Sequence, residues 1–116
     1  MSKTIIAVVD DMFFASKIRA AADALGVSVN FARSQDGLLA KLEDSKAALV
    51  IVDLHNRNLD VGSLAKRTKA FGKEIVLVGF FSHVETELQR TAIASGFDRV
   101  IPRSVFTKEL GEILRG

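Results

Sequence analysis

The chain has 116 residues, enough for one domain with an adequate hydrophobic core and too few for two. Nearly half of the residues are hydrophobic (48%), about a quarter are charged (26%), and the net charge is only +2, which is the balance of a globular protein that folds in water. The lack of cysteine excludes disulfides, thiolate metal sites and thiol catalysis, and no apolar run in the sequence is long enough to span a bilayer.

Short apolar runs alternate with segments of helical spacing along the whole chain. The predicted strands cover residues 4–9, 27–32, 48–52, 74–80 and 99–101. The predicted helices cover 14–25, closed by Gly26, then 35–43, 61–70, 88–95, closed by Gly96, and 106–114. Because the first strand begins at residue 4, there is no room for a signal peptide, and we expect a cytoplasmic protein.

The order of strand and helix repeats five times. The first and third strands are nearly unbroken apolar runs, which is typical of parallel strands covered by helices on both faces. We therefore predict an α/β fold with a five-stranded parallel sheet sandwiched by helices. No linker or repeat interrupts residues 1–116, so we expect a single domain without an attached output domain.

Carboxylates follow two of the predicted strands. Asp10 and Asp11 end the first strand, and Asp53 ends the third. In open α/β sheets, functional groups gather beyond the carboxyl ends of the strands where the strand order reverses, so these carboxylates converge if the two strands are neighbours. A hard cation such as Mg²⁺ relieves the repulsion between them, and a carboxylate can form an acyl phosphate. The three residues fit an aspartyl-phosphate site.

Each carboxylate also has a plain structural role open to it. Asp11 is placed to be the N-cap of the first helix, since an Asp oxygen accepts from backbone N–H groups there. Asp10 can be a solvated residue at a strand end, and Asp53 can begin a turn toward His55. The sequence favours a functional site only when the three carboxylates are taken together.

Four segments resemble motifs of response-regulator receiver domains, the CheY-like family. Segment 8–11 (Val-Val-Asp-Asp) resembles their acidic pair, 35–37 (Gln-Asp-Gly) the step that opens their second helix, 51–54 (Ile-Val-Asp-Leu) their phospho-acceptor strand, and 94–97 (Ala-Ser-Gly-Phe) the step before their fifth strand. The resemblance covers the whole chain in order. It implies a flavodoxin/CheY-like (βα)5 fold with strand order 2-1-3-4-5.

The resemblance implies a role in two-component signal transduction and not an enzyme. Asp53 would accept a phosphoryl group from a sensor histidine kinase or phosphotransfer protein, and the signal would pass to a downstream protein by contact. Asp10, Asp11, Asp53 and the backbone carbonyl of His55 would bind Mg²⁺. We expect a monomer or weak dimer without a membrane partner. We expect no nucleic-acid partner either, because one short basic cluster without Trp or Tyr is typical of a solvated surface (Lys66, Arg67, Lys69, Lys73).

The chain departs from the family at the end of its fourth strand, where the family places a Thr or Ser that contacts the phosphoryl group. Counting along the strand puts Gly79 at that position, and counting back from Gly96 puts Phe81 there. Ser82 is the only nearby hydroxyl. With Glu85 three residues later, Ser82 fits an N-cap of the next helix equally well.

The fifth strand departs from the family too. The family's Lys-Pro is replaced by a proline followed by Arg103, the nearest cation, and Val100 stands where the family has its aromatic switch residue. Phe80 and Phe81 cannot both face inward from one face of a strand, so we expect one of them to be exposed in a partner surface with Val100. The alternative is a bend that buries both rings.

Three functions are therefore open. A receiver phosphorylated on Asp53 is favoured by the carboxylates. A pseudo-receiver that binds its partner constitutively is favoured by the missing hydroxyl, by Arg103 and by Val100. A flavodoxin-like nucleotide-binding enzyme is a remote alternative, because it needs a phosphate-binding loop after the first strand, where this chain has Asp-Asp-Met-Phe-Phe.

Overall fold

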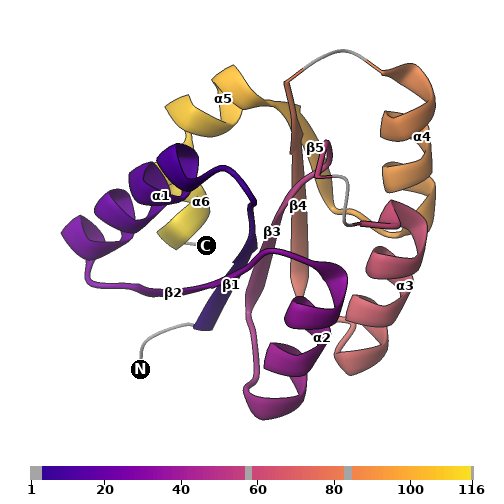
Figure 1. Ribbon diagram of the computed structural model, residues 1–116, viewed down its shortest axis with the longest axis horizontal. Coiled ribbons are helices and arrows are strands. Elements are labelled where there is room, and N and C mark those ends of the chain that lie inside the picture. Colours follow the sequence, from indigo (N-terminus) through magenta and orange to yellow (C-terminus); the bar gives the residue numbers. More distant parts are fainter. Residues whose placement is uncertain (1–3, 57–58, 83–84, 116) are drawn as a thin grey trace.

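Five parallel strands form the central sheet of the computed structural model, which describes residues 4–56, 59–82 and 85–115 (Figure 1). The sheet order is β2-β1-β3-β4-β5, as predicted. The strands agree with the predicted ones apart from small shifts at their ends: β1 (Thr4–Val8), β2 (Ser28–Ala32), β3 (Leu49–Asp53), β4 (Val76–Phe81) and β5 (Arg99–Pro102).

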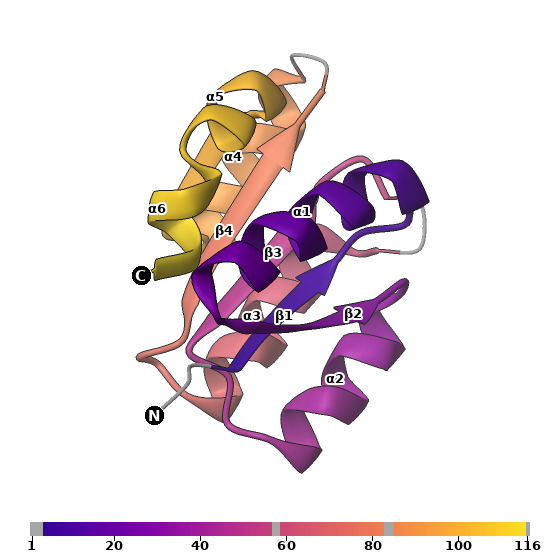
Figure 2. The same ribbon diagram turned by 90° about the vertical axis from the view of Figure 1, so that its left-hand side faces the viewer.

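Helices cover both faces of the sheet, which gives three layers (Figures 1 and 2). One face carries α1 (Met12–Leu25), α5 (Arg103–Lys108) and α6 (Leu110–Arg115), and the other carries α2 (Gln35–Asp44), α3 (Val61–Phe71) and α4 (Thr86–Ser95). The last predicted helix is thus two short helices. Glu109 separates them, because its backbone is not helical (φ −98°, ψ 8°). Its carboxylate accepts a hydrogen bond from Arg99.

The central strands explain why the sheet is parallel and covered. All side chains from Ile5 to Val8 are fully buried, and successive side chains point to opposite faces of the sheet. Ile6 and Val8 pack toward α2, α3 and α4, whereas Ile5 and Ala7 pack toward α1, α5 and α6. Each buried Ile or Val stabilises the fold by about 1.5–3 kcal/mol, so both clusters depend on the same apolar strands.

Polar caps set the helix starts at the carboxyl edge of the sheet, and glycines end two helices at the opposite edge. Asp11, Ser34 and Asp60 are the N-caps of α1, α2 and α3, and each accepts a backbone N–H. Gly26 and Gly96 end α1 and α4 with φ of 71° and 123°, a region that side chains rarely adopt, as the sequence predicts. Within the described part of the chain, no helix is both long and apolar enough to cross a membrane.

Candidate functional site

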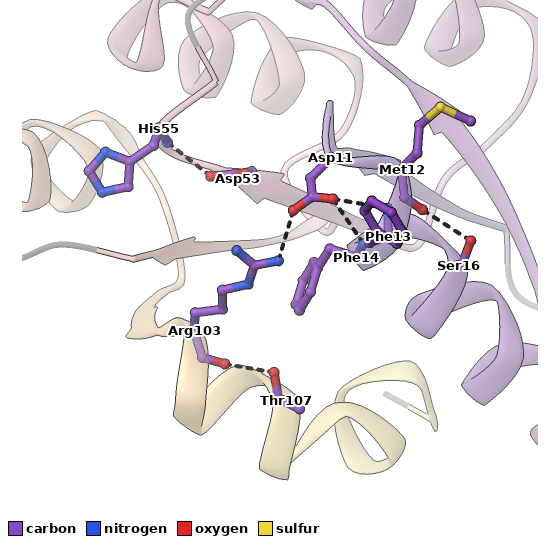
Figure 3. A network of polar contacts seen from close by, with 9 residues as sticks. All are labelled: Asp11, Met12, Phe13, Phe14, Ser16, Asp53, His55, Arg103 and Thr107. Atoms are coloured by element: carbon purple, nitrogen blue, oxygen red, sulfur yellow. Dashed lines mark hydrogen bonds and ion pairs between the residues drawn. The ribbon is translucent and has the colours of Figure 1, made fainter.

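Three charged residues meet at the carboxyl edge of the sheet (Figure 3). Asp11 follows β1, Asp53 ends β3 and Arg103 follows β5. β1 pairs with β2 on one side and with β3 on the other, so the strand order reverses between β1 and β3. The charged residues therefore lie at the place where open α/β sheets bind ligands.

Asp11 is held by hydrogen bonds from two directions. Its Oδ1 accepts from the backbone N–H groups of Phe13 (2.9 Å) and Phe14 (3.2 Å), and its Oδ2 accepts from Arg103 Nη2 (3.2 Å). The Phe14 N–H, followed by the Arg103 guanidinium, lowers the pKa of Asp11. The N-cap role considered from the sequence is confirmed, and Asp11 is the anion of an ion pair as well.

Asp53 is half-buried and carries the opposite perturbation. Its Oδ1 accepts from the backbone N–H of His55 (3.0 Å), which closes a turn after β3. Burial raises the pKa of Asp53, while the His55 N–H and the charge of Arg103 act against that rise. Oδ2 of Asp53 accepts no hydrogen bond from any described residue, so one oxygen of a partly desolvated carboxylate is available to an incoming group.

Arg103 is the cation of this edge. Its Cζ lies 4.0 Å from the centroid of the Phe14 ring, so the guanidinium stacks on an aromatic face while it donates to Asp11. Phe14 is itself buried against Phe80 and Phe106, with ring centroids 5.0 Å and 5.7 Å away. Packing therefore fixes the surface on which Arg103 rests.

Asp10 does not join Asp11 and Asp53. It is exposed and lines a pocket of about 160 Å³ between α1 and β2, together with Arg19 and Arg33. No group of three or more acidic or histidine side chains that could hold a metal ion exists among residues 4–56, 59–82 and 85–115. Asp11 caps α1 while adjacent Asp10 faces a different pocket, so the three carboxylates do not form one group in this arrangement. The binding of Mg²⁺ by these residues stays a prediction.

Two phenylalanines end β4 without forming a partner surface. Phe80 lies opposite Asp53 in the strand register and is fully buried, and Phe81 is also buried. The expectation that one ring is exposed is wrong, and no bend is needed, because β4 is covered on both faces and successive side chains point to opposite ones. Val100 is half-buried against the cluster beneath α2, α3 and α4.

Ser82 lies one residue beyond β4 and is exposed. It does not cap α4, which begins at Thr86 after Glu85, so the predicted capping pattern is wrong. Among the described residues, no hydrogen bond joins the Ser82 hydroxyl to Asp53. Its proposed contact with a phosphoryl group remains a prediction.

Sequence reasoning missed two residues that shape the edge. Asn56 is buried, and its Nδ2 donates to the backbone oxygen of Arg33 (3.0 Å), which ties the loop after β3 to the end of β2. Phe14 supports Arg103, a residue 89 positions later, and Arg103 bonds Asp11 across 92 positions. An Asn three residues after the aspartate that ends β3 is a usable signal, but spacing along the chain cannot reveal the contacts of Phe14 and Asp11 with Arg103.

No family model and no curated protein matches the sequence. Solved structures do match. A response regulator receiver domain protein (CheY-like) from Methanospirillum hungatei JF-1 aligns with a TM-score of 0.88 at 19% identity, over 99% of this chain and 92% of that chain. A response regulator from Hahella chejuensis aligns with a TM-score of 0.86 at 17% identity, over 98% and 93%.

A third match is a response regulator protein from Burkholderia pseudomallei with a phosphorylated aspartic acid, calcium ion and citrate. Its TM-score is 0.84 at 18% identity, over 97% of this chain and 66% of that chain. At such identities the likeness concerns the fold. Strand order, helix placement and these alignments together identify the chain as having the CheY-like fold of response-regulator receiver domains.

Proposed function

We propose that this chain is a receiver domain of two-component signal transduction and that Asp53 is its phospho-acceptor. The observation that carries the proposal is the position of Asp53: a half-buried carboxylate with one available oxygen, at the reversal of strand order, beside a fixed guanidinium. A sensor histidine kinase or phosphotransfer protein is the proposed donor, and a downstream protein is the proposed recipient of the signal.

The transfer follows from the chemistry of a carboxylate. Oδ2 of ionised Asp53 attacks the phosphorus of a phosphohistidine whose other ring nitrogen has taken a proton from solvent, the P–N bond breaks, and its electron pair returns to the imidazole, which leaves as a neutral ring. Arg103 is the group placed to neutralise the added charge, since a guanidinium binds phosphoryl oxygens through two parallel N–H bonds. Mg²⁺ remains a proposed cofactor, and no step here depends on it, because the described carboxylates do not assemble a metal site.

The test is intact-mass spectrometry after incubation with acetyl phosphate, with and without Mg²⁺. We expect the wild type to gain one phosphoryl group that hydroxylamine removes, as an acyl phosphate requires. Asp53→Asn should gain none. Asp36→Asn, which removes an exposed carboxylate in the first turn of α2, should behave as the wild type. A wild type that gains no phosphoryl group under either condition would contradict the proposal.

A second function, constitutive partner binding without phosphorylation, is favoured by the end of β4. The residue opposite Asp53 is the buried Phe80, and Ser82, the first residue after β4, is exposed. Amide chemical shifts on fluoroberyllate addition separate the two functions. Shifts that spread from Asp53 into α4 and β5 indicate a working switch, whereas shifts confined to the loops around Asp53 favour constitutive binding. Nucleotide binding gains no support, because α1 begins directly at the Asp11 cap.

A further inference from the structure

The acidic edge carries its own cation. Arg103 Nη2 lies 3.2 Å from Asp11 Oδ2, and the Arg103 charge also acts on Asp53. Divalent metal ions stabilise clustered carboxylates by supplying the same positive charge. In this chain a tethered guanidinium already supplies it.

Asp11 has little capacity left for a metal ion. Its two oxygens accept three hydrogen bonds, from Phe13 N, Phe14 N and Arg103 Nη2. A carboxylate offers about four acceptor positions, so a metal must either displace one of these donors or bind at the single position that remains. The two backbone donors belong to the first turn of α1 and are fixed by the helix. Only the side-chain donor can leave without unwinding α1.

A second contact, with the Phe14 ring, holds the flat face of the Arg103 guanidinium. The Phe14 ring lies beneath it at 4.0 Å and is only 3% exposed. Stacking and the ion pair use different parts of one planar group, so they favour the same side-chain orientation. A lysine at this position could bond Asp11 as a point charge but would lose the planar stack.

We propose that Arg103 is the resident counter-ion of this edge and competes with divalent metal ions for Asp11, so that a metal binds Asp11 more tightly once the guanidinium leaves. The inference rests on the proposed function for its role in signalling. A phosphoryl group on Asp53 offers Arg103 a bidentate acceptor of higher charge and so draws it from Asp11.

The experiment measures Mn²⁺ binding by the electron paramagnetic resonance signal of the free ion, without any phosphoryl donor. A negative result here is therefore distinct from a failure of Asp53 to accept a phosphoryl group. We expect Arg103→Gln to bind Mn²⁺ at least about fivefold more tightly than the wild type, with Arg103→Lys in between. Arg99→Gln is the matched control, because Arg99 carries the same charge in the adjoining strand β5 but pairs with Glu109. It should leave the affinity near that of the wild type.

Equal affinity of the wild type and Arg103→Gln, or no binding by either, would overturn the proposal. A second measurement decides the case if the variant does not fold. The Arg103 Nε–H resonance of the wild type should move during Mg²⁺ titration with the same midpoint as the Asp11 amide. Metal binding that moves the Asp11 amide and leaves the Arg103 resonance in place would overturn it equally.

Discussion

Asp11 and Asp53 stand at the same edge of the sheet, yet their surroundings shift them in opposite directions. Hydrogen bonds from Phe14 N–H and from Arg103 lower the pKa of Asp11, so its charge is stabilised by neighbours. Burial raises the pKa of Asp53, so its charge is the costly one. Such a difference between two like groups assigns them different roles: Asp11 anchors, and Asp53 is the reactive candidate.

The raised pKa of Asp53 predicts a pH-dependent effect of its replacement. The folded state holds the Asp53 proton more firmly than the unfolded chain, so this stabilisation is present below the ordinary value of 3.8 and is lost as pH rises through the folded pKa. Ionised Asp53 therefore destabilises the fold at neutral pH. We expect Asp53→Asn to raise the free energy of unfolding at pH 7, with a difference that shrinks on acidification.

Urea unfolding of both proteins across this pH range measures the difference. Asn retains an oxygen that can accept from the His55 N–H, so the turn after β3 should persist in the variant. Asp36→Asn controls for the loss of an exposed negative charge. A variant that is less stable than the wild type at pH 7 would show that the Asp53 carboxylate is stabilised by its surroundings, contrary to this reading.

At the scale of elements, packing near the end of β4 explains why Gly79 occupies a position at which the family resemblance implies a Thr or Ser. A Cβ on Gly79 would lie 3.0 Å from Leu54 Cδ2 and 3.0 Å from two Phe97 ring carbons. We expect Gly79→Ala to lower the free energy of unfolding by about 1–3 kcal/mol through overpacking. Gly111→Ala in α6 meets no atom within 4 Å and should be neutral or stabilising by up to about 1 kcal/mol.

Chemical denaturation of the two glycine variants tests this contrast. If Gly79→Ala were as stable as Gly111→Ala, Leu54 and Phe97 would have room to move, and packing could not explain the glycine. Packing leaves little room for a side chain at Gly79, and Phe81 is buried. Neither of the two positions that the resemblance suggests therefore carries a hydroxyl to the acidic edge.

Helix α4 is held less firmly than α3. α3 buries four residues and is capped by Asp60, whereas α4 buries only Ala92 and has no side-chain bond at its N-cap. Each helix also holds one buried side-chain atom without a partner, Thr68 Oγ1 in α3 and Gln89 Nε2 in α4, so these two atoms do not distinguish them. A missing cap costs about 1 kcal/mol or more. We expect α4 amides to open with a free energy about 1–2 kcal/mol below that of α3.

Native-state hydrogen exchange read by NMR compares the two helices within one sample. Equal protection of α3 and α4 would mean that contacts between them, and not the cap, set the local stability. If the difference is found, α4 is the element that a change at Asp53 can move at the lowest cost.

The elements could be predicted from the sequence wherever one local pattern decides them. Buried parallel strands leave unbroken apolar runs, and Gly26 closes α1 as expected. The break at Glu109 was missed, because apolar spacing continues across a single non-helical residue. The start of α4 was missed because Ser82 and Glu85 match a capping pattern that the chain does not use. Asp11 caps α1 and bonds Arg103, whereas Asp10 faces away from them. The sequence alone does not show which of two adjacent aspartates takes which role.

At the scale of the whole molecule, contacts at the edge depend on strand order. Phe14, Phe80 and Phe106 come from α1, β4 and α5, and their rings pack together only because the sheet brings these three elements to one face. The alternation of strands and helices predicts the sheet, but it does not predict which rings meet. The support for Arg103 is therefore a product of the complete fold.

This aromatic cluster yields a final prediction about the molecule as one cooperative unit. Phe106 is fully buried and stacks on Phe80 with ring centroids 4.7 Å apart, so Phe106→Ala should lower the free energy of unfolding by about 3–5 kcal/mol. Phe13→Ala is the matched control, because that ring is 87% exposed and its loss should change stability by less than about 0.5 kcal/mol.

Urea unfolding followed by circular dichroism measures both variants, and an unchanged m-value would show that the whole domain still unfolds together. A reduced m-value in Phe106→Ala would mean that α5 and α6 detach while the rest stays folded. Arg103 would then lose its position with α5, and Asp11 would lose its ion pair although the sheet and both carboxylates remain. The stability of the C-terminal helices would in that case control the charge of the acidic edge directly.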